Sequence, residues 1–168
     1  HRTLVEPKKN VISIVPLAEN ITRMTQYLKE IALHKADLVQ KCATTAVYTK
    51  LQRACLALII LFSQRRSEEV SPMTVAEYCK GHEGSQTVSK TDLDLSELEK
   101  KFMSGFTRIE ITSKKGRVVP ILLTSFMKEA VDLLIETRPL LKISDTNKHA
   151  LCTVSERSTG YIRGSDVI

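Results

Sequence analysis

Residues 51–70 read LQRACLALIILFSQRRSEEV, an apolar segment that runs directly into a charged box. Apolar residues keep the spacing of a core-facing helix, and further apolar residues fill most of the remaining circumference. A helix that is apolar nearly all round is buried in the middle of its domain. The segment therefore predicts a central helix, and Arg65 and Arg66 follow at its C-terminal end. Because burying an unpaired charge is expensive, these two side chains need partners or a ligand.

The segments before this helix predict a second one. Apolar residues with steps of four and three indicate a helix with one apolar stripe. These residues are Leu17, Ile21, Met24, Leu28 and Ile31. A less periodic helical stretch continues to Val39. Residues 1–10 are polar and basic, and we expect a linker or a frayed tail there, with residues 11–168 forming the folded unit.

The segment after the charged box predicts loops and then a short helix. Met73 to Tyr78 are expected to continue into a loop, and residues 80–89, with two glycines, to form a surface loop. Residues 92–102 are acidic and then basic, with apolar residues on one face, which is typical of a short helix.

A β-hairpin with a positively charged tip is predicted next. Residues 106–112 alternate between apolar and polar, and residues 117–123 are apolar and β-branched. Residues 113–116, Ser-Lys-Lys-Gly, form the turn, where Gly116 is able to take a positive φ. Pro120 indicates an edge strand.

A last helix follows the hairpin. Thr124 or Ser125 is able to cap it, and it ends before Pro139. Its apolar residues Met127, Ala130, Val131 and Leu134 share one face. No clear element is predicted from Lys142 onward. The fold class expected from this order is α+β, mostly α, with one small hairpin.

The composition of the 168 residues excludes several classes. With 42% hydrophobic and 26% charged residues, the chain is ordinary globular material. Its longest apolar run, Ala54 to Phe62, is far shorter than the about 20 residues that cross a bilayer, so no membrane segment is expected. The four cysteines and four histidines follow no zinc-ligand spacing, so we expect no metal site and reduced, intracellular thiols. The net charge of +6 allows an acidic partner such as nucleic acid.

Two features suggest phosphate chemistry. An arginine fork suits two oxygens of one phosphate, and its charge is permanent. A lysine on a hairpin tip is a compact proton donor that is able to enter a groove. Arg66 and the tip lysines, Lys114 and Lys115, therefore form a plausible pair for gripping and activating a phosphodiester. The simpler interpretations are a helix end paired with acids and a solvated turn.

The same residues resemble a known family. One stretch is similar to the first conserved box of tyrosine recombinases, the phage-integrase-like enzymes: Tyr48-Thr49-x-Leu51, then Leu61-Phe62-x-x-Arg65-Arg66-x-x-Glu69-Val70-x-x-Met73. Residues 108–124, RIEITSKKGRVVPILLT, resemble the lysine-bearing β-hairpin of that family. The nearest group is the Crypton-like one of eukaryotic mobile elements and their domesticated relatives in animal genomes. The similarity extends from about Pro16 to Asp166.

The resemblance implies roles for individual residues. Arg66 matches the first catalytic arginine, which stabilises the charge that grows on the phosphorane oxygens. Glu69 matches the acid that supports this arginine. Lys114 matches the lysine that protonates the departing 5′ oxygen, with Lys115 as the rival because a slip of one residue exchanges them. Arg65, Lys115 and Arg117 are expected to contact the DNA backbone.

The resemblance also implies parts that this sequence lacks. The family uses a His-x-x-Arg box and a nucleophilic tyrosine that forms a covalent link to DNA. No histidine here is followed by arginine three residues on, and Tyr161, the only tyrosine after the hairpin, has no such box before it. We reject Tyr161 as the nucleophile. We expect a piece of a longer chain, truncated before the second arginine box and inactive alone.

Three functional hypotheses follow from these observations. The first is a DNA-binding, N-terminal portion of a nuclear tyrosine recombinase that integrates or excises a mobile element, acting on double-stranded DNA as a homo-oligomer and without a cofactor. The second is a domesticated, catalytically inactive domain that serves as a DNA-binding or protein-interaction module. The third is a plain helical scaffold with no nucleic-acid role.

Overall fold

The computed structural model describes residues 18–84, 105–112 and 116–167. The elements, in chain order, are α1 (Ala18–Lys41), α2 (Thr45–Ser63), α3 (Ser67–Val70), α4 (Val75–Gly84), β1 (Phe106–Thr112), β2 (Val118–Thr124), α6 (Ser125–Glu136), and the 3-10 helices η2 (Arg138–Leu141) and η3 (Gly164–Asp166). This part of the chain is mostly helical and has one two-stranded antiparallel sheet. The predicted fold class, α+β and mostly α, is confirmed.

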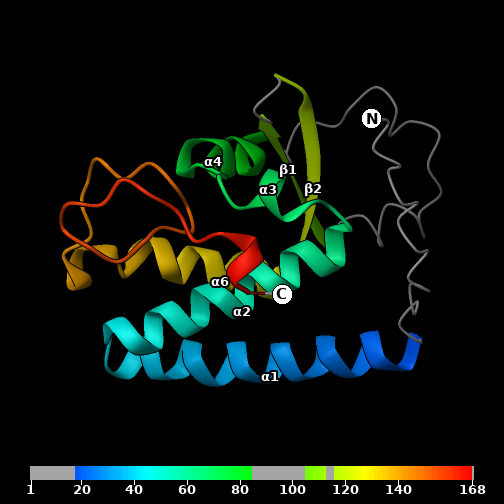
Figure 1. Ribbon diagram of the computed structural model, residues 1–168, viewed down its shortest axis with the longest axis horizontal. Helices are drawn as coiled ribbons and strands as arrows, with labels where there is room; N and C mark the ends of the chain where they lie inside the picture. The colour runs from blue at the N-terminus through cyan, green and yellow to red at the C-terminus, as the bar shows by residue number, and fades with distance from the viewer. Residues whose placement is uncertain (1–17, 85–104, 113–115, 168) are drawn as a thin grey trace, which may run out of the picture.

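Helix α2 is the centre of the fold. It packs against α1, α6 and β2 (Figure 1). Its residues from Ala54 to Ile60 are all buried. The side chain of Thr44 caps its first turn by accepting a hydrogen bond from Val47 N at 3.4 Å. By length and hydropathy α2 would also span a membrane. Its burial by neighbouring elements accounts for that composition, because a core helix is apolar on most of its surface.

Helix α1 is one continuous helix, where the sequence predicted a periodic stretch and a less regular one. Its predicted apolar stripe is only partly covered. Leu28 and Ile31 pack against the core, whereas Ile21 and Met24 are 44% and 43% exposed. Leu17, the first residue of that predicted stripe, lies outside the described residues, as do residues 1–10.

The two predicted strands pair as an antiparallel hairpin. Phe106 pairs with Thr124 at one end and Thr112 with Val118 at the other. Gly116 has a φ of 72°, the left-handed conformation that glycine adopts at no steric cost. The buried side chains of both strands, Ile109, Ile111, Val119, Ile121 and Leu123, join the core.

Helix α4 is where the sequence prediction was wrong. Residues 75–84 form a helix, not a loop, because Thr74 and Glu77 make a capping box: Thr74 N donates to Glu77 Oε2 at 3.0 Å, and Glu77 N donates to Thr74 Oγ1 at 3.2 Å. Gly81 lies in the segment that the sequence predicts as a loop, but it packs against β1. A Cβ there would lie 2.8 Å from Ile109 Cγ1. The rest of the predicted loop, residues 85–89, and the predicted helix at 92–102 lie outside the described residues.

Helix α6 confirms its prediction. Thr124 is the N-cap, accepting a hydrogen bond from Met127 N at 3.3 Å, and the helix ends at Glu136, before Pro139. The four residues of its predicted face, Met127, Ala130, Val131 and Leu134, are all buried.

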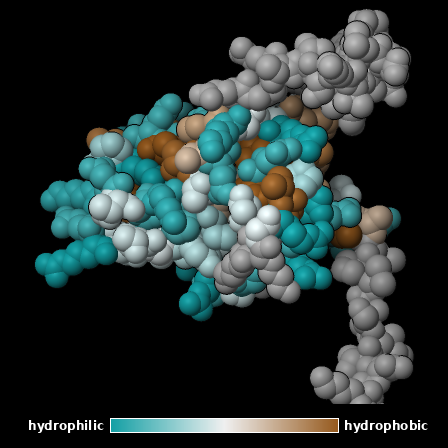
Figure 2. All heavy atoms as spheres, turned by 90° about the horizontal axis from the view of Figure 1, so that it is seen from above, coloured by the Kyte–Doolittle hydropathy of each residue, from teal (hydrophilic) through white to brown (hydrophobic). Residues whose placement is uncertain are grey.

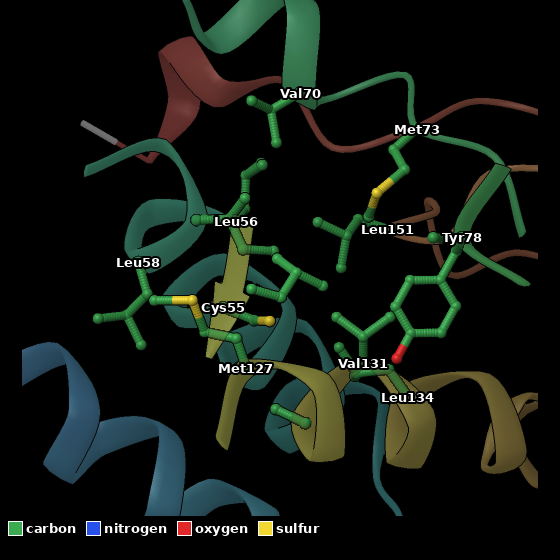
Figure 3. Packing of buried hydrophobic residues seen from close by; sticks show 14 of the residues in the cluster. Cys55, Leu56, Leu58, Val70, Met73, Tyr78, Met127, Val131, Leu134 and Leu151 are labelled. Atoms are coloured by element: carbon green, nitrogen blue, oxygen red, sulfur yellow. The ribbon is translucent and has the colours of Figure 1, made fainter. Parts of the chain in front are cut away.

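The segment after η2 is irregular but well packed. Arg138 donates to the carbonyls of Asn147, His149 and Ala150, and Asn147 Nδ2 donates to the carbonyls of Ser158 and Gly160 at 3.0 and 2.9 Å. Ala150, Leu151 and Cys152 are fully buried, and Figure 3 shows Leu151 in the same cluster as Met73 and Tyr78. Side chains bonded to backbone carbonyls therefore replace regular secondary structure here.

Candidate nucleic-acid interface

Arg65 and Arg66 lie just beyond the central helix, not in its last turn. Helix α2 ends at Ser63, and Gln64 takes the left-handed conformation with a φ of 51°. This turn ends the helix and sends the chain toward α3, with Arg66 at the N-cap of α3 in extended conformation. Both arginines are exposed.

The backbone of Arg66 is held by the start of α3. Its carbonyl accepts hydrogen bonds from Glu69 N at 2.9 Å and Val70 N at 3.4 Å, and Val70 is fully buried. The hydrogen bond between Arg66 and the half-buried Glu69 therefore joins their backbones. Over the described ranges, neither Arg65 nor Arg66 has a side-chain hydrogen bond or an ion pair. A fixed backbone and an uncommitted guanidinium are what an anion-binding arginine needs.

The end of α2 also contacts the hairpin. Ser63 Oγ donates to the carbonyl of Leu122 at 3.4 Å, and the rings of Phe62 and Phe106 stack with centroids 5.7 Å apart. Val118 lies beside the turn, four residues before Leu122 in β2. At the rise of a β-strand, four residues place the turn about 13 Å along the strand from the contact with Ser63. Arg117 is exposed beside the turn. Lys114 and Lys115 lie outside the described residues, so their convergence with Arg66 stays a prediction.

A residue that the sequence analysis gave no role, Arg163, lies next to this region. The following residue, Gly164, is buried against α3: Gly164 N donates to Ser71 Oγ at 2.8 Å. A Cβ on Gly164 would overlap Ser67 Cβ and lie 3.0 Å from Ile60 Cδ1. Figure 1 shows α3 and the red η3 beside α2. Glycine often marks a close backbone approach, but the sequence does not say which element Gly164 approaches.

A polar groove of about 430 Å³ separates α4 from the turn end of the hairpin. Its lining residues are Glu77, Lys80, Gly81, Arg108, Glu110, Thr112 and Val118. Arg108 and Glu110 pair at 2.8 Å, so the groove contains charges of both signs. Partial burial opposes the charge of Glu77, but hydrogen bonds from Thr112 and Thr74 outweigh it and hold the pKa of that carboxyl below its ordinary value.

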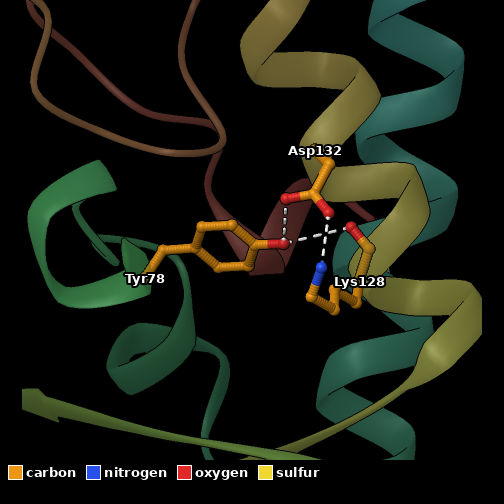
Figure 4. A network of polar contacts seen from close by, with 3 residues as sticks. All are labelled: Tyr78, Lys128 and Asp132. Atoms are coloured by element: carbon orange, nitrogen blue, oxygen red, sulfur yellow. Dashed lines mark hydrogen bonds and ion pairs between the residues drawn. The ribbon is translucent and has the colours of Figure 1, made fainter. Parts of the chain in front are cut away.

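Two buried tyrosines, Tyr48 and Tyr78, have their hydroxyls inside the fold. Tyr48 donates to the carbonyl of Leu134 at 2.8 Å, and Tyr78 donates to Asp132 Oδ1 at 2.7 Å. Asp132 also pairs with Lys128 at 2.9 Å, so Tyr78 ties α4 to α6 (Figure 4). Burial raises the pKa of both phenols, and both hydroxyls are engaged in hydrogen bonds inside the fold.

Tyr161 packs within the irregular C-terminal segment. Its ring meets the ring of His149 edge-on, with centroids 4.9 Å apart, and its backbone forms a bridge with Cys152. His149 in turn has Nδ1 2.8 Å from the carbonyl of Pro72. These contacts give Tyr161 a packing role.

The sulfur and metal chemistry of the described residues is limited. Cys55 and Cys152 are buried and Cys42 and Cys79 are exposed, and burial raises the pKa of Cys55 to about 12. Of the residues whose positions are described, no three His, Cys, Asp or Glu side chains lie close enough together to hold a metal ion.

The face of the molecule on the hairpin side is mostly hydrophilic, with separate apolar patches (Figure 2). No family model, curated protein or solved structure matches the chain. The function of this face is therefore argued from the side chains that the chain places there.

Proposed function

We propose that this chain binds duplex DNA as the first part of a tyrosine recombinase-like catalytic domain, with Arg66 on a backbone phosphate. The observation that carries the proposal is the state of Arg66: an exposed guanidinium on a fixed backbone, with no acidic partner within the part of the chain that is described. A guanidinium binds two phosphate oxygens at once and stays charged at every physiological pH.

The hairpin supports the same assignment. The strands are held against α2 and α4, while Arg117 stays exposed beside the turn. A basic turn on a rigid hairpin suits entry into a groove of DNA. The role of general acid goes to Lys114 or Lys115, on the resemblance to tyrosine recombinases alone.

A second candidate function is a DNA-binding module that does not cut DNA. The packing of Tyr161 against His149 favours it, because that contact gives Tyr161 a structural role. On either hypothesis this chain by itself binds DNA and does not cleave it.

Salt titration of duplex binding tests the proposal. Fluorescence anisotropy with a labelled duplex of about 25 base pairs gives the slope of log K against log salt, and contacts to four or five phosphates predict a slope of about −4. Arg66→Ala should make the slope less negative by about 0.9 and keep most of the affinity. Arg23→Ala, which removes an exposed arginine from α1, is the matched control. Absence of binding at low salt would contradict both candidate functions.

Covalent trapping separates binding from cleavage. A nicked duplex that prevents religation should accumulate no protein–DNA adduct with this chain, because Tyr161 is held in the C-terminal segment and lacks the second arginine box. An adduct on denaturing gels that Tyr161→Phe abolishes would overturn the assignment of Tyr161 as a packing residue.

A further inference from the structure

The close contact between Gly164 and Ser67 brings two exposed arginines together. Arg66 directly precedes Ser67, and Arg163 directly precedes Gly164. Since a Cβ on Gly164 would lie only 3.1 Å from Ser67 Cα, the Cα atoms of the two arginines are within about 12 Å of each other. Two extended arginine side chains are able to close that distance.

The acids of this region do not neutralise Arg163 in the described structure. Arg163 has no side-chain hydrogen bond or ion pair among the residues with described positions. Asp166, the nearest acid along the chain, accepts a hydrogen bond from Ser165 and lines a hollow between α1 and α2. That hollow also contains Lys35, Lys50 and Arg53, which supply Asp166 with cationic neighbours.

We propose that Arg163 and Arg66 bind the same phosphodiester of duplex DNA, one from the segment before η3 and one from the start of α3. The inference rests on the proposed function and adds a second binding residue to it. Two guanidinium groups on Cα atoms within about 12 Å of each other are able to reach one anion, and a backbone phosphate has enough oxygens to accept from both. Gly164 makes this arrangement sterically possible, since any side chain there would push the two segments apart.

The test uses the salt dependence of duplex binding by the full chain and four variants: Arg66→Ala, Arg163→Ala, the double variant, and Arg157→Ala as a control from an exposed turn. If both arginines neutralise one phosphate, the double variant should lose about 0.9 of slope in total, the value for one phosphate, and Arg163→Ala alone should weaken binding. If they contact separate phosphates, the loss should reach about 1.8, which would overturn the inference.

Two further outcomes separate the inference from the proposed function. If Arg163→Ala binds the duplex as tightly as the unaltered chain does, the inference is overturned and the proposed function stays in place. No binding by the unaltered chain overturns the proposed function, and the inference with it. Gly164→Ala keeps both charges, and in a chain that stays folded it should reproduce the binding defect of Arg163→Ala.

Discussion

Gly164 has no side chain, and this allows the chain at the start of η3 to contact α3. Gly164 is buried, and its amide donates to Ser71 Oγ. A methyl group there would overlap Ser67 Cβ and crowd Ile60 Cδ1. The contact that brings Arg163 near Arg66 therefore depends on one residue.

Gly164→Ala should destabilise the fold by about 1–3 kcal/mol, because overpacking forces backbone shifts at a buried contact. Urea denaturation followed by circular dichroism measures the change. Gly160→Ala is the matched control, because its new Cβ would meet its nearest neighbours, Ser158 Oγ and Thr153 Oγ1, at 3.4 Å, an ordinary contact distance. Equal stability of the two variants would show that the segment before η3 adjusts freely.

Glu77 joins helix α4 to strand β1. One carboxylate oxygen accepts from Thr74 N at the start of α4, and the other accepts from Thr112 N at the end of β1, at 2.9 Å. Both bonds favour the charged carboxylate, which is why the pKa of Glu77 lies below its ordinary value despite partial burial. The Glu77 side chain therefore holds both the start of α4 and the end of β1 through hydrogen bonds.

Glu77→Gln should lower stability by about 1 kcal/mol near neutral pH, because hydrogen bonds to a charged carboxylate are stronger than those to a neutral amide oxygen. Because the folded pKa is depressed, the contribution of the carboxylate is present above the ordinary pKa of glutamate and is lost as the pH falls through the folded value. Urea midpoints of the variant and the wild type should thus converge in acid. Glu110→Gln in the same groove is the control, since its exposed pair with Arg108 contributes little. A difference in urea midpoint between Glu77→Gln and the wild type that stays the same in acid would contradict the role of the charge.

The elements that sequence reasoning predicted well are those with a strong local pattern. The apolar spacing of α2, the Thr124 cap of α6 and the positive φ of Gly116 beside the hairpin turn each depend on neighbouring residues alone. Helix α4 was missed because Gly81 and Gly84 suggested a loop, although Thr74-x-x-Glu77 was a readable capping box. The C-terminal segment was missed because its order comes from distant contacts, such as Arg138 with the carbonyl of Ala150.

The candidate site was predictable in part. Arg66 could be singled out from its position after the core helix, whereas Arg163 could not, because nothing in the sequence reveals that Gly164 packs against Ser67. The reach of the hairpin lysines toward Arg66 depends on residues outside those described.

In the whole molecule, one buried helix places the segments of the proposed interface. Helix α2 ends beside β2, continues into α3 through Gln64, and contacts η3, so residues far apart in sequence flank a single region (Figure 1). Helix α1 lies along α2 at the far side from the hairpin and is expected to take no part in DNA binding.

Hydrogen–deuterium exchange of the full chain with and without duplex DNA tests this account most directly. The account predicts slower exchange in peptides covering residues 64–71, 116–124 and 161–167 when DNA is bound, with no change over residues 18–41. Protection confined to residues 18–41, or no protection anywhere at a DNA concentration that saturates binding, would contradict it.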